Sequence, residues 1–97
     1  MIEIPEDVVT GTNFARSSQT TYINEKTISG LTPIKQEKYW EVPCWNSSVS
    51  RYDYKKLITP RYVFKVYFDG NAESYSYFSE ETAQSWHNLI KDYLSQN

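Results

Sequence analysis

The stretch that decides the fold runs from Arg61 to Phe78 and reads RYVFKVYFDGNAESYSYF. On both sides of Asp69-Gly70-Asn71, aromatic and apolar residues alternate with other residues, which is the period of two that is typical of strands. Gly70 suits the positive φ of a tight hairpin turn. With a two-residue loop, either Asp69-Gly70 or Gly70-Asn71, Phe64 faces a tyrosine of the second strand, whereas a three-residue loop would swap the faces of one strand.

An amphipathic helix is predicted directly after the hairpin, so that residues 61–94 form one hairpin-plus-helix unit. Ser79 offers an N-cap, and the two glutamates that follow it favour the positive end of the helix dipole. On a helical wheel the apolar residues fall on one arc, with Trp86 as the expected central anchor. We expect this arc to pack on the hairpin face that carries Phe64. The arc consists of Ala83, Trp86, Leu89, Ile90, Tyr93 and Leu94.

The remaining two thirds of the chain give weaker signals. We expect residues 1–18 to be irregular, with one helical turn at residues 5–9, and residues 20–23 and 27–34 to form two strands around a hairpin loop. Residues 38–45 are a further strand candidate, limited by Pro43, and residues 52–58 are either a strand or a loop. The fold class is therefore α+β: a single domain over residues 1–97, with an antiparallel sheet of four to five strands and one C-terminal amphipathic helix packed on one face.

Composition restricts the setting of the protein. The 97 residues contain no apolar run long enough for a membrane span, and the acidic N-terminus does not resemble a secretory signal. Cys44 is the only cysteine, which excludes an internal disulfide and suits a reducing compartment. We therefore expect a cytoplasmic protein.

The sequence offers little catalytic chemistry. Cys44 and His87 are a conceivable nucleophile–base pair, but a buried cysteine and a partly exposed structural histidine are the simpler interpretation. Cysteine and histidine do not cluster, and the three glycines are too scattered for a phosphate-binding loop. We therefore expect a protein that is not an enzyme and has no cofactor and no metal site.

One candidate binding segment is basic. Residues 51–65 contain five basic residues and one acidic residue, a net charge of +4, in a chain whose net charge is −2. The cations are mixed with aromatic residues, as in proteins that bind single-stranded nucleic acid. Binding of nucleic acid or a nucleotide is therefore the alternative function, although dedicated binders usually have a basic domain. Its candidate residues are Arg51, Lys55, Lys56 and Arg61.

The favoured candidate site is aromatic. Nine tyrosines and three tryptophans exceed what a core of this size can bury, and both residue types are common at interface hot spots. The sequence leaves open whether Trp40 and Trp45 belong to the core instead. We predict a small non-catalytic module that binds another protein, such as a phage or mobile-element inhibitor of host machinery. The candidate interface residues are Tyr39, Trp40, Trp45, Tyr52 and Tyr54.

Two runs in the last third of the chain, Tyr62-Val-Phe-Lys-Val and the segment from Tyr75 to Leu89, carry a resemblance to a known family. Strands followed by a capped helix with an inward Trp86 resemble the last strands and closing helix of pleckstrin-homology-type domains. The resemblance implies lipid-headgroup binding as a minor alternative. The first sixty residues do not show the early basic strand–loop–strand pattern of that family, so no residue of this chain matches its phosphoinositide site.

Overall fold

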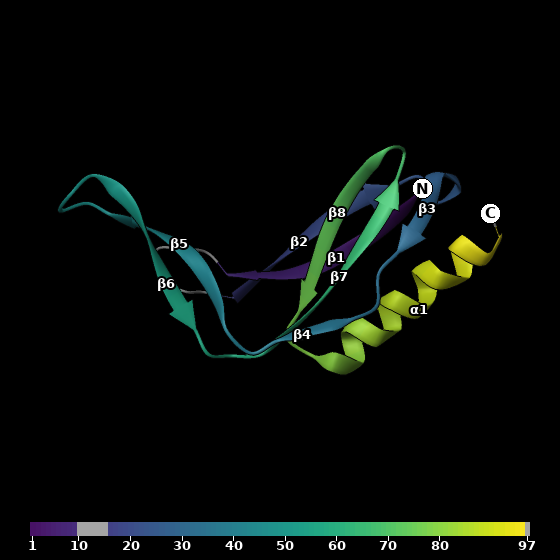
Figure 1. The fold of residues 1–97 in the computed structure, drawn as a ribbon. Coiled ribbons are helices and arrows are strands. Elements are labelled where there is room, and N and C mark those ends of the chain that lie inside the picture. Colours follow the sequence, from purple (N-terminus) through teal and green to yellow (C-terminus); the bar gives the residue numbers. More distant parts are fainter. Residues whose placement is uncertain (10–15, 97) are drawn as a thin grey trace.

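The predicted hairpin is confirmed by the structure. Strand β7 (Arg61–Phe68) pairs antiparallel with β8 (Asn71–Tyr77), and Phe64 lies opposite Tyr75 (Figure 1). The loop is the two-residue Asp69-Gly70, whose φ values of 49° and 75° are both positive, as a type I′ turn requires. This turn therefore sets the register that places Phe64, Tyr75 and Tyr77 on one buried face of the hairpin.

The computed structural model describes residues 1–9 and 16–96, which form eight strands in three antiparallel sheets and one C-terminal helix. The fold is broadly α+β, as predicted. The expected number of strands, four to five in one sheet, was too low. β1 pairs with β2, β5 pairs with β6, and β7 has β8 on one edge and both β3 and β4 on the other. The remaining elements are β1 (Ile2–Val9), β2 (Arg16–Ile23), the 3-10 turn η1 (Glu25–Thr27), β3 (Ile28–Leu31), β4 (Lys35–Glu37), β5 (Trp40–Asn46), β6 (Arg51–Leu57) and α1 (Glu80–Gln96).

The prediction of an irregular N-terminus was wrong for its described residues, and residues 10–15 lie outside the described part of the chain. β1 replaces the expected helical turn and pairs with β2 from Ile2 opposite Ile23 onward. The acidic side chains of β1 bind β8 and the residue that follows it: the Ser76 N–H donates to Glu6 Oε2 at 3.4 Å, and the Phe78 N–H donates to Asp7 Oδ2 at 3.0 Å. In the sequence, Glu6 and Asp7 resemble the acidic first turn of a helix. Their true partners could not be recognised there, because they lie 70 and 71 positions away.

The predicted hairpin between residues 20–23 and 27–34 was also wrong in its pairing. The first segment belongs to β2, and the second splits into β3 and an irregular segment before β4. Pro33 has no N–H for the sheet, so the chain leaves the edge of β7 after Leu31 and returns to it at Lys35. Thr32 bridges the gap, because its hydroxyl accepts a hydrogen bond from the Lys65 N–H at 2.8 Å.

Helix α1 covers the aromatic face of the hairpin, as predicted. The Ser79 hydroxyl accepts a hydrogen bond from the Thr82 N–H at 3.3 Å, which confirms the N-cap. Ala83 and Ile90 are the fully buried helix residues, whereas Trp86 is only half-buried against the core. The packed face is therefore centred on Ala83 and Ile90 and not on Trp86 as predicted, and Leu89, which was expected on this face, is 38% exposed. The core consists of Ile4, Ile23, Ile28, Phe64, Val66, Tyr75, Tyr77, Ala83 and Ile90.

The molecule has two visible parts, a body and a projecting arm (Figure 1). The arm is the β5–β6 hairpin with its turn, residues 40–57, and the end that carries the turn projects away from the sheet of β7 and β8. The principal extents are 52 × 24 × 18 Å, and the radius of gyration of 15.2 Å exceeds the value of about 12.5 Å that a compact chain of this length would have. The arm therefore holds its side chains away from the main core.

Candidate functional site

The base of the arm is fixed to the body by a stack of rings and guanidinium groups. The Trp40 indole N–H donates to the Thr59 carbonyl at 2.7 Å, and the Trp40 and Phe78 rings lie 6.0 Å apart. Arg61 lies 4.3 Å from the centre of the Trp40 ring, and Arg16 lies 4.7 Å from the centre of the Phe78 ring. Both are cation–π distances. This joint sets the direction in which the arm projects.

The tip of the arm is fixed by polar contacts around Asp53. Its carboxylate accepts hydrogen bonds from the Asn46 side-chain amide at 2.8 Å and from Arg51 Nε at 3.2 Å. Ser50 adopts a positive φ of 49° in the turn, and the Ser48 N–H donates to Asn46 Oδ1 at 3.1 Å. A two-stranded hairpin has little stability of its own, so these contacts and the joint both support its shape.

The two faces of the arm differ sharply in character. Side chains alternate along each strand, and directly paired residues share a face. Pairs Pro43–Tyr54 and Trp45–Tyr52 therefore lie on one face, and Lys56 joins them with its ammonium 4.4 Å from the centre of the Tyr39 ring. We call this side the aromatic face; it consists of Tyr39, Glu41, Pro43, Trp45, Tyr52, Tyr54 and Lys56.

The aromatic rings of this face are exposed and ordered relative to one another. Exposed fractions are 62% for Tyr39, 46% for Trp45, 65% for Tyr52 and 67% for Tyr54. Trp45 and Tyr52 meet edge to face, with centroids 5.1 Å apart and an interplanar angle of 70°. Four of the five predicted interface residues are thus brought together on one exposed surface.

Trp40 is the exception and corrects the predicted site. It lies on the opposite face of the arm, is 8% exposed, and belongs to the joint. The sequence contains the signal that separates it from Trp45, because the two residues are an odd number of positions apart and must point to opposite sides of a strand. Of the two alternatives that the sequence left open, a buried position holds for Trp40 and an exposed position holds for Trp45.

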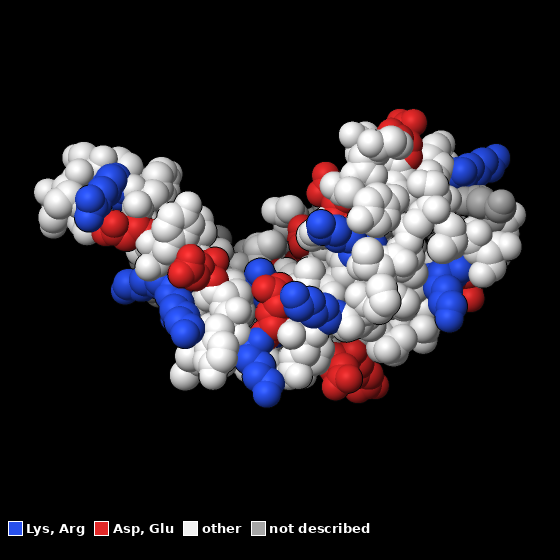
Figure 2. All heavy atoms as spheres, viewed as in Figure 1, with Lys and Arg blue, Asp and Glu red and all other residues white. Residues whose placement is uncertain are grey.

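The predicted basic site is dispersed over the structure. Arg51 and Lys55 lie on the opposite face of the arm, where Arg51 pairs with Asp53, while Lys56 lies on the aromatic face. Arg61 belongs to the body, where its Nη2 lies 3.3 Å from Glu37 Oε1. On the face shown in Figure 2, acidic side chains lie among the basic ones of the arm and body. The four predicted cations of residues 51–61 therefore do not lie together on one face of the described structure.

The candidate nucleophile and base are held in different parts of the molecule. Cys44 is a half-exposed residue of β5 in the arm, and His87 belongs to α1 in the body (Figure 1). His87 Nε2 lies 3.0 Å from the Thr32 carbonyl oxygen, and its ring meets Phe64 edge-on with centroids 5.4 Å apart. The histidine therefore has a packing role in the region where the chain leaves the sheet.

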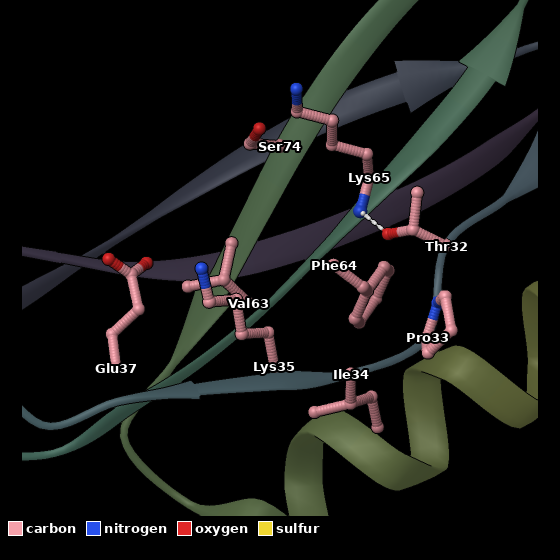
Figure 3. A pocket seen from close by; sticks show the side chains of 9 residues that line it. All are labelled: Thr32, Pro33, Ile34, Lys35, Glu37, Val63, Phe64, Lys65 and Ser74. Carbon is pink, nitrogen blue, oxygen red and sulfur yellow. Dashed lines mark hydrogen bonds between the residues drawn. The ribbon is translucent and has the colours of Figure 1, made fainter.

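A pocket of about 500 Å³ opens at the gap between β3 and β4. Figure 3 shows Phe64 between Ile34 and Pro33, with Lys65 and Thr32 above it. The Lys65 side chain extends away from the ring, and the hydrogen bond drawn from its backbone N–H to Thr32 closes one side. The pocket exists because the chain leaves the sheet at Pro33, and the edge of the Phe64 ring forms its floor.

Within residues 1–9 and 16–96, three or more histidine, cysteine or acidic side chains nowhere gather in a way that could hold a metal ion. The described helix lacks the length and apolar character needed to cross a membrane.

No family model, curated protein or solved structure matches this chain. The resemblance to pleckstrin-homology-type domains therefore stays a prediction.

Proposed function

We propose that this protein is a non-catalytic module that binds another protein through the aromatic face of its arm. The observation that carries the proposal is the set of four exposed rings, Tyr39, Trp45, Tyr52 and Tyr54, on one side of a projecting hairpin. Tyrosine and tryptophan contribute large contact areas at a small loss of side-chain entropy. Contacts such as the one between Trp45 and Tyr52 hold the rings in place before binding.

The size of the face supports an interface of modest affinity. Aromatic side chains have about 150–250 Å² each to bury, so four rings that are half to two-thirds exposed offer about 400–500 Å². At about 25 cal/mol per Å², complete burial would contribute about 10 kcal/mol before the costs of association. A standard interface buries about 800 Å² on each partner, so the aromatic face would form its centre and polar residues its rim.

We further propose that the module acts by masking a surface of its partner. The small size of the chain and its projecting arm support such a role, in which binding itself is the effect. A phage or mobile-element inhibitor of host machinery is the setting we propose on size and composition. The dispersed cations make nucleic acid a poorer candidate ligand than protein.

The test compares two exposed tyrosines in an affinity capture from a bacterial lysate treated with nuclease. Tyr54→Ala removes a ring of the aromatic face that is 67% exposed, and Tyr22→Ala removes a ring of β2 that is 61% exposed. Removing a hot-spot ring weakens binding by about 2 kcal/mol or more, which is about 30-fold. We expect a stoichiometric partner that is retained by the wild type and by Tyr22→Ala and lost by Tyr54→Ala.

The proposal is contradicted if Tyr54→Ala retains its partner as well as the wild type does. It is also contradicted if the captured material is nucleic acid that nuclease treatment removes. Equal loss in both variants would place the binding surface outside the arm.

A further inference from the structure

The pocket of about 500 Å³ between β3 and β4 is a second candidate site, and it lies in the body of the protein. Volumes of about 300–1,000 Å³ are typical of sites for small organic molecules. Thr32 is fixed at the gap: its N–H donates to the Lys65 carbonyl at 3.0 Å, and its hydroxyl accepts from the Lys65 N–H at 2.8 Å. The Thr32 carbonyl oxygen lies 3.0 Å from His87 Nε2 of the helix. These contacts hold the pocket open before any ligand binds.

One side of the pocket is apolar. Ile34 packs against the core beside Phe64, and Pro33 lies next to both residues (Figure 3). Phe64 is only 1% exposed, so the edge of its ring is the part that reaches the pocket. Ile34 and Pro33 are more accessible to solvent. Together the three side chains offer contact to an apolar group, and none of them can bind a charge.

The other side of the pocket carries two lysines. Side chains alternate along a strand, so Lys35 and Lys65 each point away from the apolar residue that precedes them. Lys35 is paired with Val63, and Lys65 follows Val63 two positions later on β7. The two lysines are therefore diagonal neighbours on one face of the sheet, with Cα atoms typically about 7–8 Å apart. Because their side chains are long, both ammonium groups can contact one anion placed over Val63.

These two lysines have no counter-charge in the described part of the chain. Neither of them forms an ion pair there. Glu37 also lines the pocket, but its Oε1 lies 3.3 Å from Arg61 Nη2 and is thus already paired. Two like charges that are neighbours on one face repel each other. The lining residues, with two lysines and one glutamate, carry a net charge of +1, which a single negative charge would neutralise.

We propose that this pocket binds a small organic acid that has one carboxylate and an apolar body. The carboxylate accepts hydrogen bonds from the ammonium groups of Lys35 and Lys65. The Ser74 hydroxyl, which lies on the same face opposite Lys65, is a further donor. The apolar body lies in the gap against Ile34 and the edge of the Phe64 ring. The ligand is thus amphipathic, as the two sides of the pocket are.

The net charge of the pocket favours a carboxylate over a phosphate group. Lysine binds either group as a point charge and does not distinguish their shapes. A phosphate monoester carries nearly two negative charges at neutral pH, and Glu37 would repel the second one. The site involves no residue of the arm, so the proposal is independent of the proposed protein interface.

The test is a titration of the whole protein at pH 7 with 3-phenylpropionate, followed by amide chemical shifts in two-dimensional NMR. We expect saturable shifts centred on residues 32–37 and 63–65, with a Kd of about 1 mM or tighter. The neutral alcohol 3-phenylpropanol has the same apolar body and should bind about fivefold more weakly or worse. Phenyl phosphate should bind no more tightly than 3-phenylpropionate.

Lysine variants assign the charge contacts. Lys35→Gln and Lys65→Gln should each weaken binding of 3-phenylpropionate by about threefold to tenfold and leave binding of 3-phenylpropanol unchanged. Both lysines are exposed, so the fold should tolerate these changes. Lys91→Gln is the matched control, because it removes the same charge from an exposed position of α1, and it should affect neither probe.

Four results would overturn the proposal. They are a 3-phenylpropionate titration without saturable shifts at the pocket, equal affinity for the acid and the alcohol, tighter binding of phenyl phosphate, and lysine variants that change the affinity for both probes alike.

Discussion

The attachment of the arm can be tested by Trp40→Phe, which keeps a ring in the joint but removes the indole N–H. The lost bond to the Thr59 carbonyl is 2.7 Å long and partly buried, and leaving a buried acceptor unpaired costs about 1–3 kcal/mol. Phenylalanine also attracts the Arg61 guanidinium less strongly than tryptophan does. We therefore expect opening of the arm to become more favourable by about 1.5–3 kcal/mol, or roughly 10- to 100-fold.

Hydrogen exchange followed by mass spectrometry measures this opening segment by segment. Protection of peptides from residues 40–57 should fall by the calculated factor, while peptides from β7, β8 and α1 keep theirs. Tyr52→Phe, a change of similar size on the exposed face, should alter neither part. Unchanged protection in the arm would refute the role of the joint, and equal loss in the body would show that the arm does not open separately.

Three further predictions concern the body. Ile90→Ala should lower the free energy of unfolding by about 2–5 kcal/mol, because Ile90 is fully buried, whereas Leu89→Ala, at a position 38% exposed, should cost much less; equal shifts in urea midpoint would contradict the packing. Burial raises the pKa of Glu6 in the folded protein. The contribution of protonated Glu6 to the free energy of unfolding is therefore fully present below the unfolded pKa, and it is lost as pH rises through the folded pKa. Glu6→Gln should therefore lose less stability than the wild type between pH 4 and 7, and identical pH profiles would contradict this. Burial also raises the pKa of Tyr75 to about 12, so stability should fall as pH rises from 10 towards 12. Tyr75→Phe should reduce that fall in alkaline urea titrations, and an unchanged fall would contradict the assignment.

The parts of the fold that were predictable are those fixed by local chemistry. Asp69-Gly70 determines the turn, and Ser79 begins the helix, within a few residues of the elements they control. The N-terminal strands could not be predicted in this way. Their pairing and the carboxylate contacts of Glu6 and Asp7 with β8 depend on residues far away in the chain, and Pro5 and the acidic pair locally favour a helix start.

The candidate site was predictable in composition and only partly in geometry. The excess of tyrosine and tryptophan correctly indicated exposed aromatic residues in the arm. The alternation that places Trp40 in the joint was visible in the sequence, but its consequence depends on Phe78 and Arg61, which come from a different part of the chain. The basic segment did not predict where its cations lie in the structure. A net charge counted along the sequence does not show on which side of a strand each cation lies.

The shape of the arm determines how far into a partner it can reach. Seven residues per strand at about 3.4 Å each give a ribbon about 24 Å long, and two strands spaced by about 4.8 Å make it about 10 Å wide. A ribbon of these dimensions can enter a crevice that would exclude the body of the protein. One wall of the crevice would then meet the aromatic face, and the other would meet the exposed residues near the tip of the opposite face, such as Arg51. The depth of a partner's crevice would thus contribute to selectivity, in addition to the chemistry of its surface.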